Sequence, residues 1–197
     1  MESFGPRRNS EILKFEFTIL TNANDYEITS KIDGFILPGV GSFDVGMKSI
    51  RSKKLDIVID DLINLEIPGL AICLGMQMLC AESEEGESTQ QGLKYFDAQV
   101  KLLDKKKSFV PSIGWNKTLQ TSNPIKNRKK IFEGDFYYLH SYSVHTSNEE
   151  EVISQYSHGS DLITAVIQKD NLVGVQFHPE KSQYSGLTLI NDYFCID

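Results

Sequence analysis

Short runs of apolar residues recur along this chain, and the spacing of the apolar positions in each run predicts a strand or a helix. Residues 34–37, 69–72 and 172–177 are nearly uninterrupted apolar runs, each followed directly by a turn. Runs of this length are typical of strands that are buried on both faces. Residues 15–20 alternate in part between apolar and polar positions, and predict a further strand before the polar turn at 21–25.

Helical spacing marks the segments between these strands. Met47 and Ile50 lie on one face of a predicted helix whose cap is Ser42 or Asp44. A second helix is predicted at residues 55–63. Two strand–helix–strand passages in succession indicate a parallel sheet with helices on its faces.

Two further helices are expected, one after residue 73 and one at the end of the chain. The first is predicted from apolar residues at helical spacing, namely Met76, Met78, Leu79 and Cys80. The second covers residues 183–194 and is predicted to place three residues on its apolar face, namely Leu187, Ile190 and Phe194.

The second half of the chain changes to alternating patterns. Residues 96–102 predict a half-exposed strand, residues 136–142 an aromatic strand, and residues 152–156 and 162–167 a pair joined by a polar turn. Residues 118–130 are expected to form a surface loop. The predicted fold is therefore α/β, an open and mostly parallel sheet with helices on both faces and an antiparallel portion in the second half.

Length and composition narrow the classes of protein. The 197 residues suffice for a single domain spanning 1–197. A formal net charge of −7 argues against nonspecific binding to nucleic acid or to an anionic membrane. The three cysteines have no metal-site spacing, so no metal or cofactor is expected. No apolar run has the length of a membrane span or a signal peptide, so a cytoplasmic location is expected.

Cys73 has the placement of a nucleophile. It ends a buried run and is followed by Gly75 and a helical pattern, so the thiol is expected at a sharp strand-to-helix turn. Exposed N–H groups at the start of the helix favour a thiolate and stabilise a developing oxyanion. The alternative is that Cys73 is a small buried core residue.

Two further turns carry candidate chemistry. Residues 38–41 read Pro-Gly-Val-Gly directly after a strand, which suits either an oxyanion loop or an ordinary turn. His178 and Glu180 follow the last predicted strand, and an extended segment would direct both side chains to one side. A doubly wound sheet can bring Cys73 to His178, which gives a Cys-His-Glu relay that attacks a carbonyl to form a thioester.

These residues resemble a known family. The resemblance is carried by five motifs, in order Pro-Gly-Val-Gly-Ser-Phe (38–43), Ile-Cys-Leu-Gly-Met-Gln (72–77), Gly-Trp-Asn (114–116), His-Ser-Tyr (140–142) and Gln-Phe-His-Pro-Glu-Lys-Ser (176–182). They are similar to those of class I (triad) glutamine amidotransferases, and more narrowly to the glutaminase subunit of imidazole glycerol phosphate synthase. The similarity covers about residues 33 to 194 and implies the amidotransferase fold and the hydrolysis of glutamine to glutamate and ammonia.

The resemblance also implies roles for individual residues. Cys73 would be the nucleophile, His178 the general base and acid, and Glu180 its orienting partner. The oxyanion hole would use N–H groups of Val40 or Gly41 and of Leu74. The glutamine would be bound by Gly39, Gln77, Glu85, Ser141 and Tyr142. Ammonia would leave near Trp115, Tyr137 and Lys181 for a (β/α)8 barrel subunit in a heterodimer.

The amino end departs from the family pattern. Members usually open with a hydrophobic strand and a glycine-rich turn, whereas residues 1–32 are atypical and residues 1–13 have no such strand. The first strand is therefore expected to be missing, through a truncated or misassigned start or through a tolerated loss.

Three functions remain open at this stage. The first is the histidine-pathway glutaminase subunit. The second is a paralogue that feeds ammonia to an amidotransferase making amidino groups on surface-polysaccharide sugars, which the unusual start and the 118–130 loop suit. The third is an inactive scaffold or regulatory subunit, against which the intact Cys73, His178 and Glu180 argue. A cysteine peptidase of related fold is disfavoured by Gln77 and the 38–41 loop.

Overall fold

The computed structural model describes residues 16–25, 32–86, 88–121 and 131–194. Its helical elements are the short 3-10 helices η1 (Ala23–Asp25), η2 (Glu149–Glu151) and η3 (Pro179–Lys181), and the α-helices α1 (Phe43–Ser52), α2 (Leu55–Asn64), α3 (Leu74–Met78) and α4 (Gln183–Phe194). Its strands are β1 (Phe35–Leu37), β2 (Gly69–Ile72), β3 (Cys80–Ser83), β4 (Gln90–Gln91), β5 (Phe96–Leu102), β6 (Ser112–Gln120), β7 (Gly134–His140), β8 (Tyr142–Thr146), β9 (Val152–His158), β10 (Asp161–Lys169) and β11 (Leu172–Val175).

The main sheet has seven strands in the order β1-β2-β11-β10-β9-β6-β7. β2 pairs in parallel with β1 and with β11, while the pairs from β11 to β7 are antiparallel. The predicted α/β class and the antiparallel portion in the second half are confirmed. The antiparallel portion is larger than the predicted mostly parallel sheet allows, because four of the six strand pairs in this sheet are antiparallel.

The antiparallel end of this sheet curls back over the parallel end. The backbone N–H of His178, just beyond β11, donates to the carbonyl of Tyr137 on β7 at 2.8 Å, although several strands separate β7 from β11 in the sheet order. β7 therefore passes over the carboxyl ends of β2 and β11. This curl brings residues that are far apart in the sequence to one edge.

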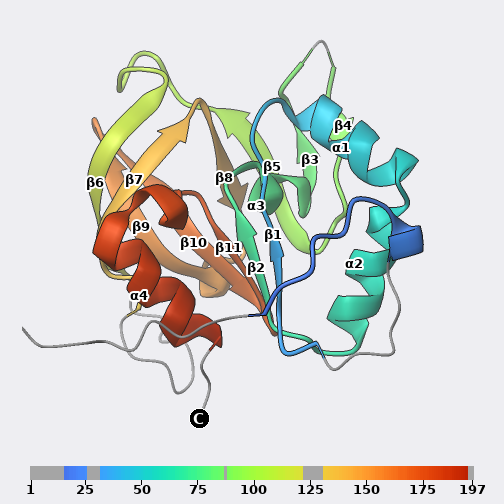
Figure 1. The fold of residues 1–197 in the computed structure, drawn as a ribbon. Helices are drawn as coiled ribbons and strands as arrows, with labels where there is room; N and C mark the ends of the chain where they lie inside the picture. Colours follow the sequence, from blue (N-terminus) through green and yellow to red (C-terminus); the bar gives the residue numbers. More distant parts are fainter. Residues whose placement is uncertain (1–15, 26–31, 87, 122–130, 195–197) are drawn as a thin grey trace, which may run out of the picture.

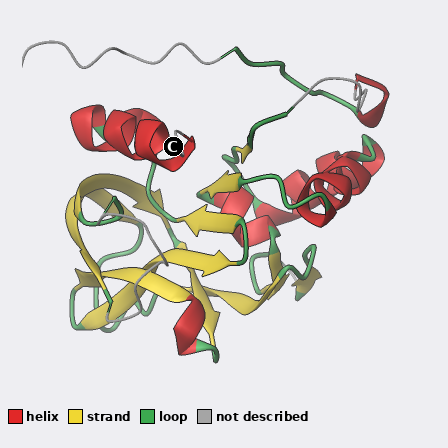
Figure 2. Cartoon of the chain, turned by 90° about the horizontal axis from the view of Figure 1, so that it is seen from below, coloured by secondary structure: helices red, strands yellow, loops and turns green. Residues whose placement is uncertain are grey.

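Strand periodicity divides the apolar residues between two cores. In β2, Leu70 and Ile72 belong to the core that α4 covers, whereas Ala71 between them faces the core with α1 and α3. Figure 1 shows α4 on one side of the strands and α1 and α2 on the other, and Figure 2 shows the same separation from below. The prediction of helices on both faces is confirmed.

A second sheet of four strands, in the order β4-β3-β5-β8, closes the α1 side. Phe96, Ala98 and Val100 alternate with exposed residues along β5 and enter the core of α1 and α3. The predicted alternating strand at residues 96–102 is thus confirmed.

Several predicted elements are confirmed and others are wrong. The helices at 55–63 and 183–194 and the strand pair around 152–167 are present. Residues 16–20 form no strand, and Phe17 and Ile19 are exposed, because no neighbouring strand among the described residues pairs with them. Residue 15 and the atypical residues 1–13 lie outside the described part, and no strand precedes β1 within residues 16–25 and 32–34.

The helix after residue 73 is shorter than predicted. It ends at Met78, and Cys80 instead begins β3, where it pairs with Phe96 of β5. The predicted loop at 118–130 starts later than expected, since Thr118 is fully buried within β6 and its hydroxyl hydrogen-bonds Tyr138. Residues 122–130 of that predicted loop lie outside the described part.

The buried face of α4 also differs from the prediction. Ile190 and Phe194 pack against the core as predicted, but Leu187 is 64% exposed, and the buried residues of the helix are Gly186, Leu189 and Tyr193. Gly186 determines this rotation, because a Cβ there would lie 1.8 Å from the carbonyl oxygen of Pro179. The close backbone contact with η3 is possible only with glycine on that side.

Candidate active site

Cys73 lies where β2 ends and α3 begins. Its N–H donates to the carbonyl of Val175 at 2.7 Å, and its own carbonyl accepts from the N–H of Gln77 at 3.1 Å. Its φ of 52° and ψ of −111° are a strained conformation for a residue with a side chain. This conformation lifts the thiol out of the sheet at the carboxyl end of the strand, as the sequence predicts.

Two glycines let the loop at residues 38–41 contact the turn at Cys73. A Cβ at Gly75 would lie 2.0 Å from the carbonyl oxygen of Leu37, and one at Gly39 would lie 2.4 Å from the backbone nitrogen of Gly75. Real Cβ atoms do not approach backbone so closely. The two glycines therefore hold the loop and the Cys73 turn at a separation that no other residue permits.

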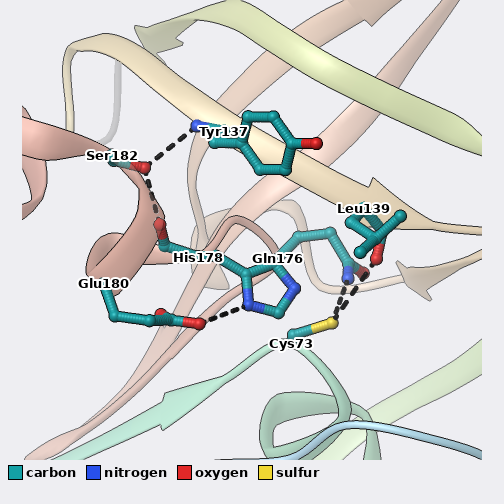
Figure 3. Close-up of polar contacts among 7 residues, drawn as sticks. All are labelled: Cys73, Tyr137, Leu139, Gln176, His178, Glu180 and Ser182. Carbon is teal, nitrogen blue, oxygen red and sulfur yellow. Dashed lines mark hydrogen bonds and ion pairs between the residues drawn. The ribbon is translucent and has the colours of Figure 1, made fainter.

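His178 and Glu180 form an ion-pair-like contact within one turn. The Nδ1 atom of His178 lies 2.7 Å from a carboxylate oxygen of Glu180, and the imidazole is 2% exposed. Pro179–Lys181 is a 3-10 helix rather than the extended segment we expected, so the turn brings the two side chains together. In Figure 3 the imidazole is drawn between Glu180 and Cys73.

Ser182 holds the backbone of His178 in place. Its hydroxyl donates to the carbonyl of His178 at 2.6 Å and accepts from the N–H of Tyr137 at 2.9 Å. The N–H of His178 donates to Tyr137 in turn. The contacts of the Ser182 hydroxyl are drawn in Figure 3, and together with the bond to the Tyr137 carbonyl they fix His178 between η3 and β7.

Among the described residues, two polar groups from other parts of the chain lie within hydrogen-bond distance of the sulfur of Cys73, and neither belongs to His178. The sulfur lies 3.9 Å from the carbonyl oxygen of Leu139 and 3.7 Å from the side-chain nitrogen of Gln176. Burial is the main reason that the pKa of the Cys73 thiol is raised to about 11; the N–H of Leu74 and the Gln176 amide act in the opposite direction, and the charge of Glu180 raises it further. The expected preference for a thiolate at the helix start is thus outweighed by burial, and the resting cysteine is a thiol at neutral pH.

A pocket of about 230 Å³ opens at this edge. Its lining residues are Val40, Gly41, Cys73, Leu74, Gln77, Glu85, Leu139, His140, Ser141, Tyr142, His178 and Lys181. Pockets for drug-sized ligands measure roughly 300–1,000 Å³, so this one suits a molecule as small as an amino acid. Most of the residues that the sequence singled out therefore meet around one small cavity.

The remaining predicted residues lie around the pocket rather than in its lining. Gly39 is packed against Gly75, and Glu180 reaches the site through His178. Trp115 and Tyr137 face each other across β6 and β7 with ring centroids 6.1 Å apart, and the ammonium of Lys181 lies 6.0 Å from the Tyr137 ring. Trp115 is 47% exposed, so this cluster is a partly apolar surface beside the pocket mouth.

Known proteins are similar to this chain in sequence and in fold. The model of the family "Glutamine amidotransferase class-I" matches residues 7–195. The chain belongs to this family. Among curated relatives, the amidotransferase is 37% identical over 188 residues to imidazole glycerol phosphate synthase subunit HisH of Leptospira borgpetersenii, covering 92% of this chain and 88% of the relative. It is 39% identical over 183 residues to subunit HisH 2 of Nitrobacter winogradskyi, covering 89% and 84%.

Solved structures share the fold of this amidotransferase. A glutamine amidotransferase from Thermotoga maritima superposes with a TM-score of 0.55 at 20% identity, over 86% of this chain and 67% of that one. PurLQS from the same organism superposes with a TM-score of 0.57 at 16% identity, over 80% and 77%.

Sequence reasoning assigned no role to three residues that the amidotransferase fold brings to the nucleophile, namely Leu139, His140 and Gln176. Leu139 and His140 arrive through the curl of the sheet, which no local pattern encodes. Gln176 carries a signal that could have been used, because a polar side chain within an otherwise apolar buried strand needs a hydrogen-bond partner. Within the described residues of the amidotransferase, no cluster of three or more His, Cys, Asp or Glu side chains has the geometry to hold a metal ion, and no helix is long and apolar enough to span a membrane.

His140 is held as a neutral imidazole beneath the pocket. Nδ1 lies 2.8 Å from the carbonyl oxygen of Tyr142, which only accepts, so Nδ1 carries the proton. Nε2 therefore accepts from the hydroxyl of Tyr156 at 2.7 Å, and that oxygen also lies 3.0 Å from the hydroxyl of Ser112. Burial lowers the pKa of His140 to about 4.

This burial predicts a loss of stability in acid. A free histidine in the unfolded chain binds a proton below about pH 6.5, while the folded one does so only below about pH 4, so the unfolded state binds more protons between these values. The free energy of unfolding should therefore fall as the pH drops through this window, by about 3 kcal/mol from His140 alone. Chemical denaturation at a series of pH values, on wild type and His140→Gln, measures it. The free energy of unfolding of wild type minus that of His140→Gln should decrease as the pH is lowered from 6.5 to about 4. A pH-independent difference would contradict the assignment of His140 as a buried neutral imidazole.

Proposed function

We propose that this chain hydrolyses glutamine to glutamate and ammonia, with Cys73 as nucleophile, His178 as general base and acid, and Glu180 as the residue that orients His178. The observation that carries the proposal is the placement of a strained cysteine and a Glu-bound histidine on the same small pocket, from opposite halves of the chain. Membership of the amidotransferase family supports it.

The chemistry follows from the protonation states. Glu180 accepts the Nδ1 proton of His178, which leaves Nε2 as the basic nitrogen. Because the resting Cys73 is a thiol, its proton passes to Nε2 as the sulfur attacks the amide carbon of the substrate. The imidazolium then gives that proton to the amide nitrogen, the C–N bond breaks and ammonia leaves, and the acyl group remains on Cys73 as a thioester. Water, deprotonated by Nε2, cleaves the thioester to glutamate and restores the thiol.

The negative oxygen formed at each attack needs N–H donors. We assign this role to the N–H of Leu74, which follows Cys73 directly, and to that of Val40 or Gly41. All three residues line the pocket. Gly39 contributes by bringing the 38–41 loop close enough to Gly75 for its N–H groups to serve the same oxygen.

The other end of glutamine would be held on the far side of the pocket. Gln77 donates to the Tyr142 carbonyl and to Gln176 through its nitrogen, so its amide oxygen is the atom available to accept from the substrate. Glu85 lines the pocket while one of its oxygens accepts from the N–H of Phe43 at 2.9 Å, and its negative charge suits the substrate ammonium. Ser141 and Tyr142 lie where the substrate carboxylate would bind.

The partner follows from the relatives' names. HisH is named in them as a subunit of imidazole glycerol phosphate synthase, so we infer that this chain supplies ammonia to the synthase subunit of a heterodimer in histidine biosynthesis. That subunit would be a (β/α)8 barrel. Its docking surface would be the cluster of Trp115, Tyr137 and Lys181, which borders the pocket mouth and is partly exposed.

The test is glutamate release from glutamine by the purified chain, alone and with the barrel subunit from the same cell. We expect little release by the chain alone and a clear increase when the barrel subunit and its ligand are present. Ammonia and glutamate should then form in equal amounts. A folded complex that releases no glutamate would overturn the proposed activity, and full activity without the barrel would overturn the dependence on the partner.

A further inference from the structure

Gln176 is a fully buried polar residue at the end of β11, between Val175 and Phe177. Its backbone N–H donates to the carbonyl of Ala165, which fixes the residue on the sheet. Its side chain passes under the pocket, with Nε2 3.7 Å from the sulfur of Cys73 and Oε1 3.2 Å from Nε2 of Gln77. Figure 3 shows the Gln176 amide directed at the sulfur.

The orientation of this amide follows from its neighbours. The carbonyl of Tyr142 can only accept, so the end of Gln77 that lies 3.0 Å from it must be the NH₂ group. The same NH₂ group faces Gln176, so the end of Gln176 that it contacts must be the oxygen. The NH₂ group of Gln176 is thereby turned toward the sulfur of Cys73.

We propose that Gln176 stabilises the thiolate of Cys73 as it forms, by donating an N–H to the sulfur from beneath the pocket. The inference rests on the proposed function, in which that thiolate attacks glutamine. A hydrogen bond to an ionised acceptor is about twice as strong as one to a neutral acceptor, so the contact favours the thiolate over the thiol. The carbonyl of Leu139, the other neighbour of the sulfur, can only accept and so favours the thiol.

The contacts of the sulfur with Leu139 and with Gln176 act at different steps of the reaction. While the proton is on sulfur, Leu139 accepts it; once the proton has moved to His178, the Gln176 amide stabilises the charge on sulfur, and the N–H of Leu74 acts in the same direction. Burial is the main cause of the raised pKa of Cys73, and the Gln176 amide opposes it. Loss of this amide should therefore act on the reactivity of Cys73 more than on the affinity for glutamine, since Gln77 keeps its bond to Tyr142.

The experiment measures the alkylation of Cys73 by iodoacetamide between pH 6.5 and 10, followed by mass spectrometry of the Cys73 peptide. We expect Gln176→Met to lower the rate at pH 8 about tenfold, which corresponds to a rise of about one unit in the pKa of the thiol. The matched control is Gln168→Met, which replaces a glutamine on β10 whose amide donates to the Asp170 carbonyl instead. Glutaminase assays of the same proteins with the barrel subunit should show a similar fall in kcat and a KM within about threefold of wild type.

The outcomes separate this inference from the proposed function. Alkylation needs no glutamine, so a shifted alkylation profile in a chain without glutaminase activity would sustain the role of Gln176 and overturn the proposed function. An unchanged profile in folded Gln176→Met would overturn the role of Gln176. If circular dichroism shows Gln176→Met to be unfolded, Gln77→Met tests the same contact, because without Gln77 the amide of Gln176 is no longer oriented; alkylation about threefold slower is then expected, and an unchanged rate would contradict the inference.

Discussion

Replacing Cys73 with alanine should lower glutamine hydrolysis in the complex with the barrel subunit by ~10⁴ to 10⁶-fold, the range found when a protease triad loses one of its members. The thioester cannot form without the sulfur, and His178 alone has no group to activate against the amide. The substitution removes one atom from a nearly buried site, so folding and binding of the barrel subunit should persist. Glutamate release under saturating glutamine measures the loss.

The matched control for this prediction is Cys80→Ala. Cys80 is also buried, but its sulfur lies 3.6 Å from the carbonyl of Met76 within the α1 core, away from the pocket. This variant should keep most of the glutaminase activity. Hydrolysis by folded Cys73→Ala at more than roughly a hundredth of the wild-type rate would show that another group is the nucleophile.

Gly75→Ala should combine the largest loss of stability with a large loss of activity. The new Cβ would lie 2.0 Å from the carbonyl oxygen of Leu37, which belongs to β1 and cannot move without shifting the sheet edge. Overpacking of this kind costs about 3 kcal/mol in the free energy of unfolding. Because the same contact places the 38–41 loop over Cys73, a shift of about 1 Å should also lower kcat ~100-fold. Urea denaturation and glutamate release measure the two effects.

Gly46→Ala is the control for this substitution. Gly46 is also a helical glycine in close contact, but a Cβ there would first meet the sulfur of Met78 at 2.6 Å, which is the flexible end of a side chain. Alanine is favoured over glycine in a helix by about 1 kcal/mol, so this variant should be close to wild type in stability and kcat. Equal behaviour of the two variants would show that the backbone contact at Gly75 is not what positions the loop.

The sequence predicted the parts of this fold that depend on local patterns. The helix at 183–194, the strands at 34–37 and 69–72 and the strand before His178 follow from apolar spacing and from the turns that end them. The proximity of Cys73 and His178 was predictable, because both follow buried strands and the carboxyl ends of parallel strands meet at one edge of a sheet. These features are encoded in the local sequence and do not depend on which element packs against which.

The errors arose where a neighbouring element decides the outcome. Cys80 fits a helical pattern, but pairing with Phe96 draws it into β3. Leu187 fits an apolar face with Ile190 and Phe194, but the close contact of Gly186 with Pro179 leaves Leu187 exposed while the other two pack against the core. Phe17 and Ile19 fit a strand that has no described partner.

The sequence predicted which motif residues form the candidate site, but it did not predict the groups that surround them or the burial of Cys73. The curl that places Leu139 at the sulfur and His140 in the pocket lining depends on the pairing of antiparallel strands. The raised pKa of Cys73 likewise depends on how deeply the turn is buried, which a sequence pattern does not contain. The division of the chain into a single domain over 1–197 stays a prediction.

Cys73 is the residue on which the thioester with the substrate is proposed to form. The most direct measurement is peptide mapping of the chain, in complex with the barrel subunit, after treatment with a glutamine analogue that carries a diazoketone in place of the amide. We expect one label per chain, on Cys73. Excess glutamine should prevent the labelling, and Cys73→Ala should carry no label. A label on Cys80 or Cys195, or none in a complex that still hydrolyses glutamine, would contradict it.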